Sequence, residues 1–154
     1  MKRLWAPWRI KYIRNAKLKK CIFCENKKFI ILKTKYSLAA LNIFPYNNGH
    51  IMVAPYRHKK DFSQLTDTEI LDLFKTLNKT KALLDKILKP DGYNIGANLS
   101  RAAGAGIPGH LHIHIVPRFN GDTNFMPVLG DTKVISQSLD ELYKQLKHAK
   151  SKTA

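Results

Sequence analysis

Short apolar runs separated by polar turns indicate five strands along this chain. They span Phe29–Lys33, Ser37–Ile43, His50–Pro55, Tyr93–Ala97 and Leu111–Pro117. In the last run polar and apolar residues alternate strictly, which is the period of a strand with two different faces. Asn47-Asn48-Gly49 predicts a turn just before the third strand.

One long helix is predicted between the third and fourth strands. Thr66 and Glu69 have the spacing of a capping box at its start, and the run from Lys89 to Gly92 ends it. Apolar residues recur near helical spacing at Ile70, Leu73, Phe74, Leu77, Leu84 and Leu88. A second helix is predicted from Ser138, with Glu141 as its capping partner. Its apolar positions are Leu139, Leu142 and Leu146.

The 154 residues suffice for one domain, and antiparallel strands with one long helix between them make it α+β. We expect this domain at residues 21–148, between a basic, aromatic arm (1–20) and a frayed tail (149–154). Three aromatic residues of the arm are expected to pack on the body or on a partner: Trp5, Trp8 and Tyr12. No run reaches the roughly 20 apolar residues of a membrane span, and no apolar signal region follows the basic start. We therefore expect a cytoplasmic protein without membrane contact.

The net charge favours an anionic ligand. Lys and Arg number 27 against 11 Asp and Glu, which gives +16 and a pI near 10.0. Such a field attracts nucleotides, polyphosphates or nucleic acid. The lysines are scattered over the whole chain, however, so a solvated lysine-rich surface explains the charge as well as a nucleic-acid patch does.

Three histidines stand at alternate positions of the last predicted strand: His110, His112 and His114. They therefore share one face, while Leu111, Ile113 and Ile115 point the other way. Packing alone explains this poorly, because three buried imidazoles bring six ring nitrogens that all need partners. Such a face suits metal ligation. It equally suits transfer of a phosphoryl or nucleotidyl group through a neutral imidazole.

Two further motifs have chemical meaning. The loop from Ser100 to Gly109 has three glycines just before the histidine strand, so its backbone can approach a ligand and offer N–H groups to phosphate oxygens. Cys21 and Cys24 form a C-x-x-C pair. In a reducing compartment this pair binds a metal or acts in redox chemistry, and the spacing leaves both open.

The segment from Gly109 to Arg118 resembles the histidine-triad motif, His-φ-His-φ-His-φ-φ, where φ is apolar. Further resemblance lies in Cys21–Cys24 (C-x-F-C), in Asn42 with Gly49–Pro55, and in Leu4–Arg9, Gly96–Gly109 and Phe119–Val128. Together these motifs resemble the short diadenosine-tetraphosphate phosphorylase branch of bacterial histidine-triad (HIT) proteins. The resemblance implies the HIT fold: an antiparallel sheet with one long helix and a C-terminal helix, assembled as a two-fold dimer.

By this resemblance His112 is the nucleophile. It attacks the α-phosphorus of a nucleotide and then waits as a nucleotidyl-imidazole for phosphate or water, while His114 donates to a phosphoryl oxygen. The favoured reaction converts diadenosine tetraphosphate and inorganic phosphate to ADP and ATP. Two alternatives stay open: a hydrolase of dinucleoside polyphosphates or of AMP conjugates (a phosphoramidase), and a non-catalytic, zinc-stabilised module that binds nucleotide or RNA.

The resemblance also implies substrate contacts. Asn42 binds the ribose hydroxyls, and His50 lies beside the nucleophile. The residues implied at the phosphates are Asn98, Gly106 and Gly109, and those implied in substrate selection at the dimer are Asp122, Thr123 and Asn124. Many relatives carry Gln with Ser or Thr where this chain reads Gly106-Ile107-Pro108-Gly109. Backbone N–H groups must substitute here, so phosphate and water both stay open as acceptor.

A structural zinc ion is the cofactor that the resemblance implies. Its ligands are Cys21, Cys24, His58 and His110. Two thiolates and two imidazoles form a closed tetrahedral shell, so this metal is not expected to touch the substrate. We expect no organic cofactor.

Overall fold

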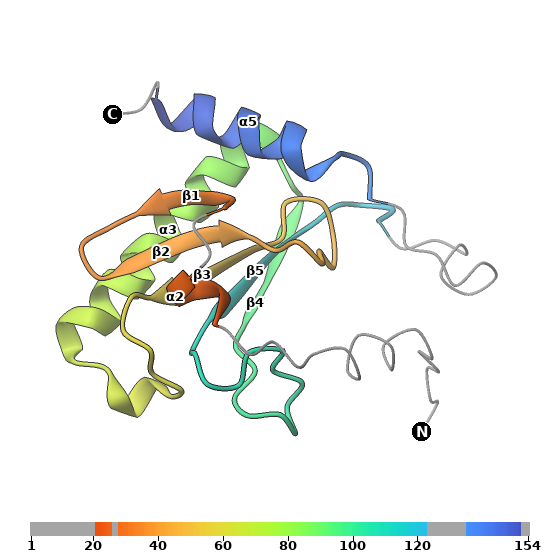
Figure 1. Ribbon diagram of the computed structural model, residues 1–154. Coiled ribbons are helices and arrows are strands. Elements are labelled where there is room, and N and C mark those ends of the chain that lie inside the picture. Colours follow the sequence, from red (N-terminus) through yellow and green to blue (C-terminus); the bar gives the residue numbers. More distant parts are fainter. Residues whose placement is uncertain (1–20, 26–27, 123–134, 152–154) are drawn as a thin grey trace.

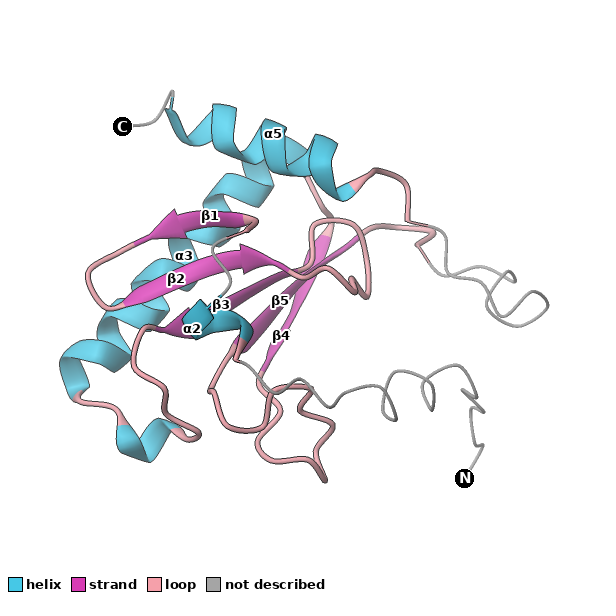
Figure 2. Cartoon of the chain, in the orientation of Figure 1, coloured by secondary structure: helices cyan, strands magenta, loops and turns pink. Residues whose placement is uncertain are grey.

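A computed structural model of the chain describes residues 21–25, 28–122 and 135–151. Its centre is a five-stranded antiparallel sheet in the order β1-β2-β3-β5-β4 (Figures 1 and 2). The strands are β1 (Ile30–Lys33), β2 (Ser37–Leu41), β3 (Ile51–Pro55), β4 (Gly92–Gly96) and β5 (Ile113–Arg118). The helices are α2 (Ile22–Glu25), the 3₁₀ turn η1 (Phe62–Gln64), α3 (Asp67–Leu88) and α5 (Leu139–Ser151). The expected α+β architecture is confirmed, and the ends of the strands shift by two residues or fewer.

The two faces of the sheet have different coverings. On one face α3 and α5 enclose the main core, which contains Leu73, Leu84, Leu142 and Leu146 together with alternate residues of all the inner strands. On the other face a smaller apolar cluster lies under α2: Phe23, Ile30, Leu38, Ala40, Met52 and Ala54. Strands β2 and β3 are buried throughout because both of their faces are covered. Among the described residues, no helix has both the length and the apolar character needed to cross a membrane.

Helix α3 begins where the sequence predicts. The Thr66 hydroxyl accepts a bond from the backbone N–H of Glu69, and the Glu69 carboxylate accepts one from the N–H of Thr66. Phe74, however, was expected on the buried stripe and is 48% exposed. It lies roughly 100° around the helix from Leu73, whereas the buried face of α3 also includes Thr76 and Thr80.

Two boundaries differ from the predictions in ways that matter locally. The β5 ladder starts only at Ile113, because the N–H of Leu111 bonds the carbonyl of Lys59 in the loop after β3. At the other end of the chain α5 continues to Ser151, and Ala149 is buried. Residues 149–151, which we expected in the tail, are therefore helical.

Candidate active site

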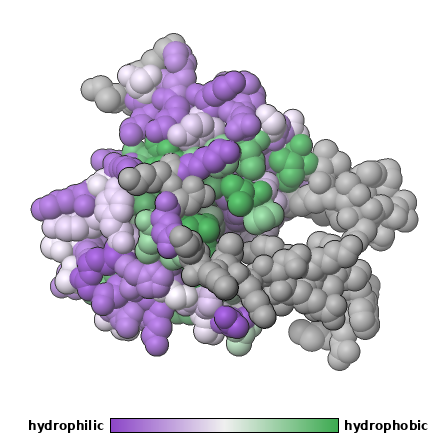
Figure 3. Space-filling view, in the orientation of Figure 1, coloured by the Kyte–Doolittle hydropathy of each residue, from purple (hydrophilic) through white to green (hydrophobic). Residues whose placement is uncertain are grey.

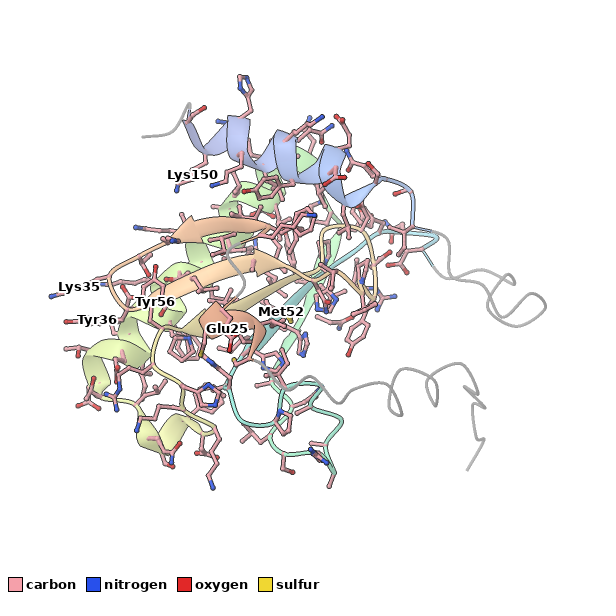
Figure 4. The ribbon with its side chains drawn as sticks, viewed as in Figure 1. Glu25, Lys35, Tyr36, Met52, Tyr56 and Lys150 are labelled. Carbon is pink, nitrogen blue, oxygen red and sulfur yellow. The ribbon has the colours of Figure 1, made fainter. Side chains whose placement is uncertain are left out.

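The triad histidines lie where their alternation predicts. Leu111, Ile113 and Ile115 enter the main core, and the three imidazoles occupy the opposite face of the sheet. His114 pairs with Met52 of β3, which lies under α2 (Figure 4). The His112 and His114 ring centroids are 4.9 Å apart. One strand end thus presents neighbouring imidazoles on a single surface.

The tautomer of His112 is set by the main chain. Its Nδ1 lies 2.8 Å from the carbonyl oxygen of His110, which can only accept, so Nδ1 carries the proton and Nε2 keeps a lone pair. No described residue bonds to Nε2. The ring is 3% exposed, and burial lowers its pKa below the ordinary histidine value. Near neutral pH, His112 is therefore an uncharged imidazole with a basic Nε2, the form that attacks phosphorus.

A second chain of bonds fixes the tautomer of His114. The backbone N–H of Tyr46 donates to Nδ1 of His50 (3.0 Å), so the His50 proton is on Nε2. That Nε2 lies 2.9 Å from Nδ1 of His114 and donates to it. The remaining His114 proton is therefore on Nε2, ready to donate. Burial, and secondarily the repulsion that a protonated His112 would exert, lower the pKa of His114 to about 4, so this donor is neutral near neutral pH.

His50 lies next to His114, whose ring is the neighbour of His112. Its Nε2 bonds Nδ1 of His114, and its ring centroid is 4.6 Å from that of Tyr46. Asn42 lies beside it: the Asn42 side-chain N–H reaches Nδ1 of His50 at 3.4 Å, and its carbonyl oxygen accepts from the N–H of Phe44. His50 therefore connects the β2–β3 loop to His114.

The other expected substrate residues that the structure describes lie in loops outside the strands. Asn98 and Gly106 are half-buried in the loop between β4 and β5. Gly109 lies against His58, since a Cβ there would be 3.2 Å from the imidazole Nε2. Asp122 forms two hydrogen bonds with the guanidinium of Arg118, at 2.7 and 2.8 Å, and accepts a third from Asn47 at 2.7 Å. Its carboxylate thus ties the end of β5 to the β2–β3 loop. Thr123 and Asn124 lie outside the described residues.

The four expected metal ligands converge. The sulfur of Cys21 is 3.2 Å from Nδ1 of His110, and the sulfur of Cys24 is 3.3 Å from Nδ1 of His58. All four ligand atoms lie within 4.8 Å of one another. His110 donates from Nε2 to the carbonyl of Pro55 (2.8 Å), which leaves the Nδ1 lone pair facing the sulfurs. Neighbouring ligands of a tetrahedral zinc ion are about 3.5 Å apart, so the donor set and its spacing fit zinc.

An apolar pocket next to the triad escaped the sequence analysis. It lies on the α2 side of the sheet, with Lys28 as its one charged lining residue, and its apolar lining consists of Ile22, Phe23, Ile30, Leu38, Ala40, Leu41, Ile43 and Met52. At its margin Ile43 and Phe44 expose 43% and 60% of their surface, and Figure 3 shows an apolar area over this loop, below α5. The alternation of Leu38 and Ala40 was a usable signal. Combining it with Ile30, Met52 and Phe23, however, required the strand register and the position of α2.

Comparison with known proteins agrees with this geometry. The family model of the HIT domain matches residues 24–121. An AP-4-A phosphorylase of Mycobacterium tuberculosis is 34% identical over 154 residues, covering 90% of this chain and 79% of that protein. A bis(5'-nucleosyl)-tetraphosphatase (asymmetrical) of Schizosaccharomyces pombe is 34% identical over 93 residues, or 60% of this chain and 50% of that protein.

Among solved structures, the hypothetical histidine triad nucleotide-binding protein ST2152 of Sulfolobus tokodaii has the same fold. Its TM-score is 0.70 at 22% sequence identity, and the match covers 86% of this chain and 93% of that chain. The HIT-domain match spans well over half of the sequence. The chain therefore belongs to the histidine-triad (HIT) family.

Proposed function

We propose that the protein cleaves dinucleoside polyphosphates by transferring a nucleotidyl group to Nε2 of His112 and then to inorganic phosphate. The bond from Nδ1 of His112 to the His110 carbonyl supports this proposal most directly. This bond holds the uncharged His112 ring in the tautomer whose lone pair is on Nε2. The relationship to an AP-4-A phosphorylase over 90% of the chain favours diadenosine tetraphosphate as substrate.

In the first step the Nε2 lone pair of His112 attacks the α-phosphorus. A P–N bond forms, the P–O bond to the bridging oxygen breaks, and the polyphosphate leaves with that bond's electron pair. The ring becomes positively charged and still holds its Nδ1 proton, so the carbonyl of His110 accepts a stronger, charge-assisted hydrogen bond. In the second step a phosphate oxygen attacks the same phosphorus, and Nε2 recovers its lone pair.

His114 stabilises both transition states in this scheme. Its Nε2–H is free to donate to a non-bridging phosphoryl oxygen, because His50 occupies Nδ1. A pre-positioned donor of this kind typically contributes a factor of about 100–1,000 in rate. A neutral donor also avoids trapping the substrate as a tight ion pair.

The nucleoside has a place beside this centre. Ala40, Met52 and His114 pair in register across β2, β3 and β5, so the apolar pocket extends from Met52, one strand from His114, to Ala40, about 10 Å from it at roughly 4.8 Å per strand. That distance suits a nucleobase in the pocket with its ribose at Asn42. Backbone N–H groups of the loop around Asn98, Gly106 and Gly109 would then meet the phosphates, and Thr123 and Asn124 stay expected contacts.

A zinc ion at Cys21, Cys24, His58 and His110 would have a structural role. Its four protein ligands leave no coordination position open for substrate. Bound there, it would tie α2 and the loop after β3 to the segment that leads into β5. The His112 ring is outside this cluster and stays available for attack.

Within residues 21–25, 28–122 and 135–151, no strand pairs with the outer edge of β4, and this edge favours a two-fold dimer. Strand β4 is the last in the sheet, and Ile95 on it is 48% exposed. Leu71 and Phe74 on α3 expose 55% and 48% of their surface. A second copy across this edge would cover backbone donors and acceptors together with apolar side chains.

Hydrolysis is the second candidate function, favoured by the similarity to a tetraphosphatase. Incubation of the protein with diadenosine tetraphosphate, with and without inorganic phosphate, separates the two. ADP and ATP formed only when phosphate is present support phosphorolysis. AMP and ATP formed in water alone would make the protein a hydrolase. Binding of the substrate without any turnover would leave a nucleotide-binding module and refute both candidates.

A further inference from the structure

Phe23 is the one described side chain whose ring contacts both His110 of the metal cluster and His112. Its ring centroid is 5.1 Å from that of His110 and 5.3 Å from that of His112. The side chain is 8% exposed and also forms part of the apolar pocket. In the sequence it lies between Cys21 and Cys24. One residue therefore joins the metal cluster, the nucleophile and the pocket.

The position of Phe23 depends on a very short element. Helix α2 has four residues, and its turn is closed by bonds from the N–H groups of Cys24 and Glu25 to the carbonyl of Cys21. A single helical turn is unstable on its own. Its anchors among the described residues are the two sulfurs that face His58 and His110, and the apolar packing of Ile22 and Phe23.

We propose that Phe23 couples occupancy of the metal cluster to nucleotide binding. With zinc on its four ligands, the α2 turn is fixed and holds the Phe23 ring against His112 and at the wall of the pocket. Without zinc the turn is released, and both the pocket wall and one side of the nucleophile are lost. This inference rests on the proposed function, since it assumes that the nucleotide occupies the pocket beside the triad.

The remaining walls of the pocket give a matched control. Ile30 is 8% exposed and comes from β1, which is held by the sheet rather than by the metal ligands. Truncation of Ile30 should weaken nucleotide binding without changing its dependence on zinc. Truncation of Phe23 should weaken binding and also remove that dependence. The comparison separates a pocket residue from a coupling residue.

The experiment measures zinc affinity by competition with a chelating dye, with and without saturating AMP. Coupling is reciprocal, so AMP must raise zinc affinity by the same factor by which zinc raises AMP affinity. In the wild type and in Ile30→Ala we expect AMP to raise the zinc affinity by a factor of about 5 or more, which is within the usual range for coupled sites. The factor should fall toward 1 in Phe23→Ala and to an intermediate value in Phe23→Leu, which keeps most of the apolar volume. Circular dichroism of each zinc-loaded variant checks its fold.

Three results would overturn the inference. If the wild type binds AMP but its zinc affinity is the same with and without AMP, the two ligands bind independently of each other. If AMP raises the zinc affinity of both Phe23 variants by the same factor as in the wild type, zinc acts by stabilising the whole domain rather than through Phe23. Failure of the zinc-loaded wild type to bind AMP or diadenosine tetraphosphate at all would refute the proposed function, and this inference with it.

Discussion

Replacement of His50 tests how the site holds its proton donor. In His50→Ala the donor to Nδ1 of His114 is lost, so the His114 proton is free to move to Nδ1 and the Nε2–H is no longer guaranteed. Loss of one buried hydrogen bond of this kind costs about 1–2 kcal/mol, which is roughly a 5- to 30-fold slower first step. His50→Gln keeps an amide N–H able to reach Nδ1 of His114 and should recover much of the rate.

The assay is the single-turnover rate of nucleotidyl transfer to the protein, followed by rapid quench with labelled diadenosine tetraphosphate. His50 is 1% exposed, and its removal also orphans the N–H of Tyr46, so His50→Ala should lose about 2–4 kcal/mol of stability. Rates are therefore measured well below each variant's melting temperature. His50→Gln serves as the folded reference.

A double-mutant cycle makes this prediction sharp. If His50 acts only through His114, then His50→Ala should have almost no further effect on the rate in a His114→Ala background. Equal slowing by His50→Ala in both backgrounds would refute the idea that His50 acts by holding the His114 proton on Nε2. An unchanged rate in His50→Ala alone would refute it as well.

Three other perturbations have defined outcomes. Gly49→Ala should lower the free energy of unfolding in urea by about 2–4 kcal/mol, because φ is +79° and the new Cβ would lie 2.5 Å from Leu88. Gly92→Ala should be nearly neutral, because a Cβ there has nothing within 4 Å. Equal effects of the two substitutions would contradict this prediction. The pKa of His114 is about 4 when folded and near 6.5 when unfolded, so the unfolded state binds more protons between these values. The free energy of unfolding should therefore fall by at most about 3 kcal/mol as the pH drops from 6.5 toward 4. His114→Gln should make this pH dependence shallower. An unchanged slope in the variant would argue against the assignment to His114. His58→Ala should lower the zinc content and the melting temperature, while exposed His148→Ala should change neither; full zinc retention in His58→Ala would exclude that ligand.

Local patterns predicted much of this protein because the features involved are short-range. Strict alternation places His112 and His114 on one face whatever the rest of the fold does. The capping box at Thr66 is likewise contained within four residues. The convergence of Cys21 and His58 on one cluster spans distant segments and came from the family resemblance instead.

The contacts that sequence reasoning missed depend on tertiary position. That His50 bonds His114 follows from the pairing of β3 with β5, which no local period reveals. The bonds from Asp122 to Arg118 and Asn47 likewise join distant segments, and its expected role in substrate selection stays a prediction. Phe74 was misjudged because it lies at the margin of a helical face whose centre is defined only once the sheet is in place.

The most direct test is to trap the covalent intermediate. The protein is mixed with a slowly turned-over dinucleoside polyphosphate, quenched under conditions that preserve P–N bonds, digested and fragmented in the mass spectrometer. We expect one nucleotidyl group on His112, none on His110 or His114, and no adduct in His112→Ala. Turnover that continues in His112→Ala, or an adduct located on another residue, would contradict the assignment of the nucleophile.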